Sequence, residues 1–282
     1  MKKACVVISI VLLLLLVLSL SLALFQKNIP LRSRVALVRI EGPIMDSRDT
    51  VDEIKDYVKD NSIKAIILRI DSPGGAVAPS QEIYEEVKKA AADKKVVVSM
   101  GSIAASGGYY IAAPADLVMA NPGTLTGSIG VIMEIPNVEG LMSKIGIRTE
   151  VIKSGKHKDM ASAFRKMEKE DRDLLQNVMD NVHEQFIRAV AAGRKLKVED
   201  LRPIADGRIF TGEQAKAIKL VDELGTLEDA VKKAGELAGI SGEPEVVEKK
   251  ERLSLIEMLQ SRFPKEIADI FPSIKIKFLY TP

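Results

Sequence analysis

The chain has 282 residues, of which 46% are hydrophobic and 28% charged, so it is long enough to bury one large core or two small ones. The formal net charge is only +2, and the lysine pairs are scattered among acidic residues, which argues against a nucleic-acid surface. The single cysteine excludes a disulfide within one chain.

The N-terminal stretch predicts a membrane anchor. Residues 4–25 contain no charged side chain, and at about 1.5 Å per residue a helix of this length crosses a hydrocarbon core roughly 30 Å thick. The apolar run is also longer than the roughly 7–15 residues of a cleavable signal peptide. We expect a cytoplasmic N-terminus at residues 1–3 and an uncleaved single-pass anchor in the lipid of the cell membrane at residues 4–25. A linker at residues 26–33 then leads to an extracytoplasmic body. Basic residues lie on both sides of the anchor, so the positive-inside rule does not decide its orientation.

Strands and helices alternate from residue 34 onward, which predicts a mainly parallel sheet with helices on its faces. The expected strands are residues 34–40, 65–70, 95–100, 117–120, 129–133 and 149–153, and the expected helices are residues 50–61, 79–92, 138–145, 168–194, 198–205, 211–218 and 227–238. The near-continuous apolar run at residues 65–70 is typical of a strand covered on both faces. The apolar stripe of the longest helix, at residues 168–194, predicts a core or a subunit interface.

The strand at residues 95–100 leads into a turn of small residues around Ser106. Alanines and glycines on both sides of this serine leave room for the backbone of a substrate. A helix starting just after it would point free N–H groups at a developing oxyanion. Ser106 is therefore a candidate nucleophile, although the same stretch taken alone is also typical of a packing turn.

A serine nucleophile needs a base, and the chain has two histidines. His183 is predicted to lie on the surface of the longest helix. His157 would have to form a Ser-His-Asp triad, but Ala104 replaces the first glycine of the G-x-S-x-G pattern. A Ser-His-Asp triad with His157 therefore remains an open alternative.

A lysine can act as the base when it is neutral, because burial lowers the pKa of an amine from about 10.4 toward 7–8. The segment at residues 153–162 offers Lys153, Lys156 and Lys158. Its spacing does not choose among them, and such a segment is also typical of an exposed basic loop.

Two further stretches are able to complete a site. At residues 71–75, a Pro-Gly-Gly turn directly after a strand bares backbone amides, as an oxyanion hole requires. Residues 124–130 supply hydroxyls that can hold a lysine amine. Each is also typical of an ordinary loop.

We find no metal-ligand spacing, and Glu150 and His157 break the only segment similar to a phosphate loop, so we expect no metal, nucleotide or other cofactor.

These stretches occur in a characteristic order. Residues 71–75, 100–110, 125–130 and 154–159, behind an N-terminal anchor, resemble the short, single-repeat signal peptide peptidase A family within the ClpP/crotonase superfamily. The resemblance covers roughly residues 34–240. It implies an α/β, ClpP/crotonase-like serine protease domain over residues 34–240, followed by a C-terminal segment and tail at residues 241–282, whose entry into the active site is left open.

The resemblance also implies an activity and a set of residues. It implies a membrane-anchored serine endopeptidase with a Ser/Lys dyad that degrades remnant signal peptides. Ser106 matches the nucleophile, Lys158 the general base and Ser128 the hydroxyl that orients the base. Gly75 matches an oxyanion N–H donor, together with the N–H of Ser106. The resemblance further implies a ring-shaped homo-octamer, in which the serine and the lysine of one site come from adjacent subunits.

Other functions remain open at this point. The chain is also compatible with a membrane-tethered protease of the same fold that cuts one particular membrane or envelope protein. A non-catalytic crotonase-type scaffold that binds lipid or partner proteins is disfavoured by the presence of both Ser106 and Lys158. An acyl-CoA enzyme is disfavoured because the anchor separates the body from cytosolic acyl-CoA.

Overall fold

The computed structural model describes residues 33–249 and 277–279 of the chain. The predicted membrane anchor at residues 4–25 lies outside these residues. Within the described part, no helix combines the length and the hydropathy that a membrane span requires.

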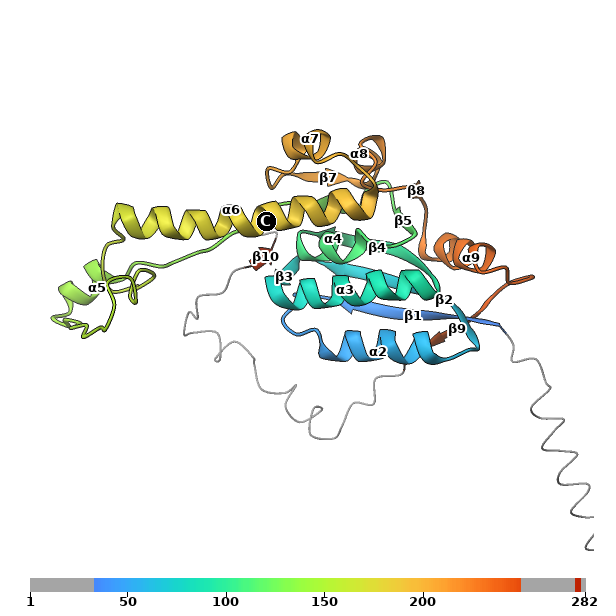
Figure 1. The fold of residues 1–282 in the computed structure, drawn as a ribbon, viewed down its shortest axis with the longest axis horizontal. Helices are drawn as coiled ribbons and strands as arrows, with labels where there is room; N and C mark the ends of the chain where they lie inside the picture. Colours follow the sequence, from blue (N-terminus) through green and yellow to red (C-terminus); the bar gives the residue numbers. More distant parts are fainter. Residues whose placement is uncertain (1–32, 250–276, 280–282) are drawn as a thin grey trace, which may run out of the picture. The chain divides into compact units, whose positions relative to one another are not determined.

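An eight-stranded sheet forms the centre of the fold (Figure 1). Its main path runs in the order β7-β6-β4-β2-β1-β9, and β5 and β8 extend it from β4. All pairs are parallel except β6 with β7. The strands are β1 (Arg34–Glu41), β2 (Ile63–Ser72), β4 (Lys95–Ala105), β5 (Leu117–Ala120), β6 (Leu125–Gly127), β7 (Ile209–Thr211), β8 (Glu223–Leu224) and β9 (Glu245–Glu248). A separate antiparallel pair consists of β3 (Gly74–Ala76) and β10 (Lys277–Leu279).

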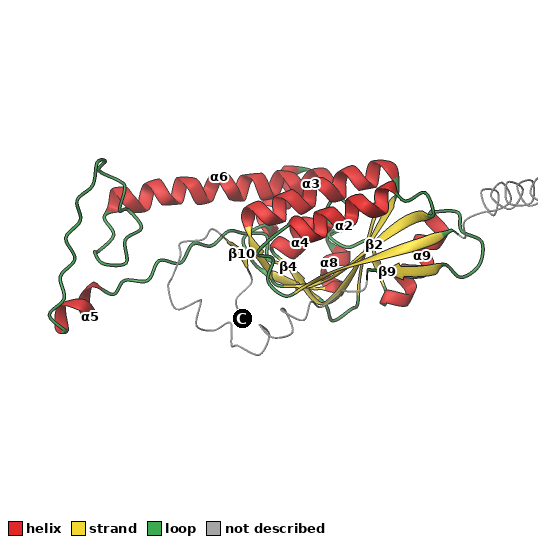
Figure 2. Ribbon diagram, turned by 90° about the horizontal axis from the view of Figure 1, so that it is seen from below, coloured by secondary structure: helices red, strands yellow, loops and turns green. Residues whose placement is uncertain are grey.

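Helices cover both faces of the sheet (Figure 2). Because side chains alternate along a strand, Ala36 and Val38 of β1 face one core, and Val35 and Leu37 face the other. The first core packs against α2 (Arg48–Lys59), α3 (Val77–Asp93), α4 (Gly107–Ala112) and α6 (Lys169–Arg194), and the second against α9 (Leu227–Leu237). Each large side chain fully buried there stabilises the fold by about 1.5–3 kcal/mol. The sheet is therefore the middle layer of three.

The longest helix, α6, serves two regions. Its C-terminal half buries Phe186 and Val190 in the core, whereas Leu174 and Val178 in its N-terminal half are 39% and 42% exposed. Residues 133–168, which we call the arm, run beside this N-terminal half and contain α5 (Glu139–Lys144) (Figures 1 and 2). Three short helices, α7 (Val198–Leu201), η1 (Arg202–Ile204) and α8 (Gly212–Ala217), follow α6.

The structure confirms the α/β class, the mainly parallel sheet and its flanking helices, and it corrects two predicted strands. Residues 129–133 and 149–153 are not strands. The first follows β6, which forms at Leu125–Gly127 instead, and the second lies in the arm, where none of the described strands pairs with it. The Pro-Gly-Gly stretch after β2 also differs from the expected turn, because Gly74–Ala76 forms the short strand β3.

Candidate active site

Ser106 lies at the junction of β4 and α4 in an uncommon backbone conformation. Its φ of 53° and ψ of −117° fall in a region that non-glycine residues rarely adopt, at a cost of about 1–3 kcal/mol. The residue is 1% exposed, and its Oγ is buried without a hydrogen-bond partner among the described residues. A buried hydroxyl without a partner is costly. Both features are typical of a group held in place for reaction.

The backbone of Gly75 lies beside Ser106. A Cβ placed on Gly107 would lie 3.2 Å from the nitrogen of Gly75, so the two glycines are in close contact. The neighbouring amides of β3 are already used, because Gly74 donates to Ser72 Oγ at 3.1 Å and Ala76 donates to the carbonyl of Ile44 at 2.8 Å. Since successive amides of a strand point to opposite edges, the Gly75 N–H points away from Ile44.

The structure corrects one part of the predicted oxyanion hole. The N–H of Ser106 donates to the carbonyl of Gly127 at 2.8 Å and thereby joins β4 to β6, so this amide is not available to an oxyanion. The next amide, of Gly107, belongs to the first turn of α4 and has no acceptor within the helix. The sequence does contain the signal for this residue, because a helix beginning directly after a serine leaves its first amide unpaired. The candidate donors are therefore the N–H of Gly107 and the N–H of Gly75, which faces the edge where β10 pairs with β3.

Ser128 lies next to Ser106 at the end of the neighbouring strand. The pairing of β4 with β6 places Ala105 opposite Gly127, so each serine is the residue that follows a paired position. Ser128 is 7% exposed and has a φ of 51°. A cavity of about 410 Å³ opens beside it and is also lined by His183, whose buried Nε2 has no partner among the described residues. His183 is thus partly covered rather than a simple surface residue.

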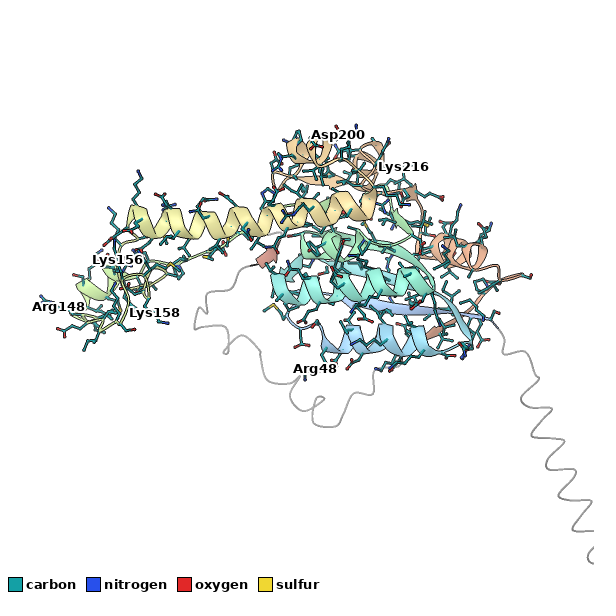
Figure 3. The ribbon with its side chains drawn as sticks, in the orientation of Figure 1. Arg48, Arg148, Lys156, Lys158, Asp200 and Lys216 are labelled. Carbon is teal, nitrogen blue, oxygen red and sulfur yellow. The ribbon has the colours of Figure 1, made fainter. Side chains whose placement is uncertain are left out.

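Lys158 lies on the arm, at the end of α6 remote from α4 (Figure 3). The structure thus places Ser106, Gly75 and Ser128 together but leaves Lys158 apart from them within one chain.

The structure also distinguishes the three lysines of the loop. Lys153 is paired with Asp159 and Lys156 with Glu170, whereas Lys158 is exposed and has no ion pair or hydrogen bond from its amine among the described residues.

These pairs affect which lysine is able to act as a base. The hydrogen bond that Lys156 donates to Glu170 raises the pKa of Lys156. An amine bound to a carboxylate keeps its proton and is a poor base. Lys158 is the lysine of this loop whose amine remains available.

The triad with His157 does not form within one chain. His157 is on the arm, with Nδ1 3.5 Å from Asp171 Oδ1 and Nε2 3.5 Å from Glu170 Oε1. Both ring nitrogens face carboxylates of α6, and Nδ1 has no hydrogen-bond partner among the described residues.

The edge of β3 accepts an extended strand. β10 pairs with β3 in antiparallel orientation, with Phe278 opposite Gly75 and Leu279 opposite Gly74. The tail of the chain therefore lies where a peptide would have to lie for its carbonyl to reach the glycine amides.

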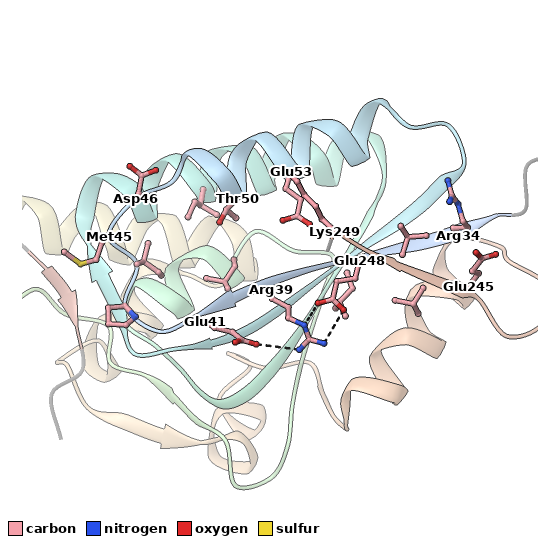
Figure 4. A pocket seen from close by; sticks show the side chains of 17 residues that line it. Arg34, Arg39, Glu41, Met45, Asp46, Thr50, Glu53, Glu245, Glu248 and Lys249 are labelled. Atoms are coloured by element: carbon pink, nitrogen blue, oxygen red, sulfur yellow. Dashed lines mark hydrogen bonds and ion pairs between the residues drawn. The ribbon is translucent and has the colours of Figure 1, made fainter. Parts of the chain in front are cut away.

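A second, larger cavity of about 1100 Å³ lies at the β1–β9 edge of the sheet, below α2 (Figure 4). Arg39 forms ion pairs there with Glu248 and Glu41. None of the predicted site residues lines it. We therefore place the candidate active site at Ser106.

A strained serine at a strand end, beside the backbone amides of two glycines, is typical of peptidases that use a serine nucleophile. Comparison with known families agrees with this class. The model of peptidase family S49 matches residues 88–241, and the chain belongs to this family.

Three relatives support the assignment. A putative protease of Synechocystis is 46% identical over 77% of this chain and 78% of its own length. Protease 4 of Salmonella typhi is 42% identical over 72% of this chain, which spans only 34% of that protein. A putative signal peptide peptidase SppA of Enterococcus faecium is 38% identical over 64% of this chain and 52% of its own length. The chain is thus an SppA-like protease that acts on peptides, and a serine mechanism is typical of its family.

Proposed function

We propose that this chain is a membrane-anchored serine endopeptidase that degrades remnant signal peptides, with Ser106 and Lys158 as its catalytic dyad. The observation that carries the proposal is the buried Oγ of Ser106, which has no partner in the described part of the chain and lies beside the backbone of Gly75 and Gly107. The apolar stretch at residues 4–25 supports a single-pass anchor in the cell membrane with an extracytoplasmic catalytic domain. The layered parallel sheet supports a ClpP/crotonase-like fold.

The proposed mechanism is acyl transfer. The neutral amine of Lys158 accepts the proton of Ser106, and the resulting alkoxide attacks the peptide carbonyl carbon. The N–H groups of Gly75 and Gly107 stabilise the oxyanion, while the hydroxyl of Ser128 orients the amine. Lys158 then donates its proton to the leaving amine, and a water molecule, deprotonated by the same lysine, hydrolyses the acyl-enzyme. Every step uses groups of the protein, the peptide or water.

The position of Lys158 on the arm leads us to propose that each site forms between adjacent subunits of a homo-oligomer, with eight subunits as the resemblance implies. Apolar side chains on the arm support such a contact, because soluble proteins seldom expose large apolar residues in a cluster. These residues are Leu141, Ile145, Ile147, Val151, Ile152 and Phe164, which are 46% to 103% exposed.

The substrate class follows from the same site. A remnant signal peptide is short and apolar, and in extended form it is able to replace β10 along the edge of β3. The name of the Enterococcus faecium relative supports this class of substrate.

Serine-specific labelling tests the proposal. The detergent-solubilised full chain should react with a fluorophosphonate probe, Ser106→Ala should lose the labelling, and Lys158→Ala should lose most of it, whereas Lys153→Ala should keep it. Labelling retained in Ser106→Ala would remove the nucleophile from the proposal. A chain that neither reacts nor hydrolyses peptides would instead be the non-catalytic scaffold.

The cleavage profile separates the two protease alternatives. Cleavage of many apolar peptides of different lengths supports signal peptide degradation. One dominant membrane or envelope protein as target, with apolar peptides left intact, favours the dedicated protease instead.

A further inference from the structure

The loop that carries Lys158 is tied to the start of α6 by one arginine. Arg165 donates from Nε to Asp159 Oδ2 at 3.1 Å and from a terminal nitrogen to Asp159 Oδ1 at 3.1 Å. The interaction with this carboxylate is therefore bidentate. The same terminal nitrogen lies 2.7 Å from Asp171 Oδ2. Arg165 therefore links the residue next to Lys158 to the first turn of α6.

This link is shielded, unlike most ion pairs at a protein surface. The side chains of Asp159 and Asp171 are only 12% and 5% exposed, and that of Arg165 is 26% exposed. Contact with Arg165 is the main reason that the pKa values of both carboxyl groups are lowered, through hydrogen bonds for Asp159 and a close ion pair for Asp171. Both carboxylates thus stay charged at neutral pH. Losing the arginine would leave two poorly solvated anions beside the loop.

The backbone on both sides of Lys158 is also fixed. His157 faces Asp171 and Glu170, and the N–H of Lys158 donates to Gly155 in a tight turn at 3.2 Å. The side chains before and after Lys158 thus contact α6 or Arg165, while the amine of Lys158 itself has no partner among the described residues.

The same contacts keep a nearby carboxylate away from the amine. Asp159 accepts hydrogen bonds from Arg165 and Lys153, so both of its oxygens are occupied. A free carboxylate in this position would attract the amine of Lys158 and keep it protonated. The charged or titratable groups that face this part of the loop are Lys153, Lys156, His157, Arg165, Glu170 and Asp171.

We propose that Arg165 is a positioning residue of the catalytic dyad: by holding Asp159 and Asp171, it presents Lys158 to the serine and keeps its amine free of the adjacent carboxylate. The proposal rests on the function proposed above, because it gives Lys158 the role of the base. The physical reason is that a long, flexible side chain on a mobile loop would seldom reach reactive geometry.

The test compares Arg165→Met with Arg172→Met in the full-length, detergent-solubilised enzyme. Arg172 is exposed, lies one residue after Asp171 and loses the same charge. Arg165→Met should lower kcat about tenfold or more, with KM unchanged within about twofold. It should also raise the apparent pKa of the pH–rate profile, because Asp159 Oδ2 loses its donor and becomes able to pair with the amine, while Lys153 keeps Oδ1. Arg172→Met should match the wild type.

The double variant Arg165→Met/Asp159→Asn separates the two effects. It lacks the freed carboxylate, so the pH–rate profile should return to that of the wild type while kcat stays low. Full activity and an unchanged profile in Arg165→Met, together with an inactive Lys158→Ala, would overturn the positioning role and leave the dyad intact.

Two further outcomes are decisive. Wild-type activity in Lys158→Ala would refute the proposed function itself. If Arg165→Met and Asp159→Asn lose activity only in step with loss of the assembled species on size exclusion, the arginine is purely structural and the inference is wrong.

Discussion

Ser106 and Ser72 are both buried, but their hydroxyls are in opposite situations. Ser72 Oγ donates to the carbonyl of Gly42 at 2.6 Å and accepts from Gly74, whereas Ser106 Oγ has no partner among the described residues. Ser72→Ala should therefore lower the free energy of unfolding by about 1–3 kcal/mol, while Ser106→Ala should leave it unchanged or raise it. Hydrolysis should fall at least about 10³-fold in Ser106→Ala. Urea unfolding and peptide hydrolysis measure the two effects, and equal destabilisation by both substitutions would contradict a reactive role for Ser106.

Gly75 tolerates no side chain, because a Cβ there would lie 2.0 Å from the carbonyl oxygen of Ile44. Gly75→Ala should displace β3, lower the free energy of unfolding by about 1–3 kcal/mol and abolish most hydrolysis by moving the amide. Gly123→Ala is the matched control, because nothing lies within 4 Å of its added methyl group. A Gly75→Ala enzyme with wild-type stability and rate would show that the backbone at β3 is not constrained as described.

The pairing of β10 with β3 makes the tail a competitor for the substrate. Because β10 is tethered to the same chain, it is present at the edge of β3 at a high effective concentration. Deleting residues 277–282 should lower KM for a peptide by at least about twofold and speed fluorophosphonate labelling, with little change in the thermal midpoint. Adding the tail back as a free peptide should inhibit the truncated enzyme. An unchanged KM would mean that β10 does not occupy the substrate path in solution.

Subunit mixing tests the division of the site between two chains. Ser106→Ala and Lys158→Ala should each be inactive, but their mixed assembly pairs an intact serine with the intact lysine of a neighbour. Random mixing in equal amounts should restore about a quarter of wild-type activity, because each repeated interface combines one of two serine donors with one of two lysine donors. Co-expression with two different tags, followed by double purification and peptide hydrolysis, measures the recovery. No activity in a verified mixed assembly would contradict a site completed by a second subunit.

Local patterns in the sequence were sufficient to locate most of the helices and strands. Apolar runs bounded by polar turns located β2 and β5, and a period of about four residues located α6, because burial against a layer imposes these periods directly. The strands expected at residues 129–133 and 149–153 were wrong, because an apolar run becomes a strand only where another strand offers hydrogen bonds.

The sequence by itself determined the layered α/β class, the candidate serine turn and, through four motifs in order, the family, since each of these depends on neighbours along the chain. Only the tertiary structure showed that the amide of Ser106 is bound to Gly127, that Gly107 is the first residue of α4, and that Lys153 and Lys156 are paired while the amine of Lys158 has no partner among the described residues. These facts depend on which groups, distant in sequence, reach hydrogen-bonding distance. Strand register and the packing of the arm on α6 decide that distance, and no local period encodes either one.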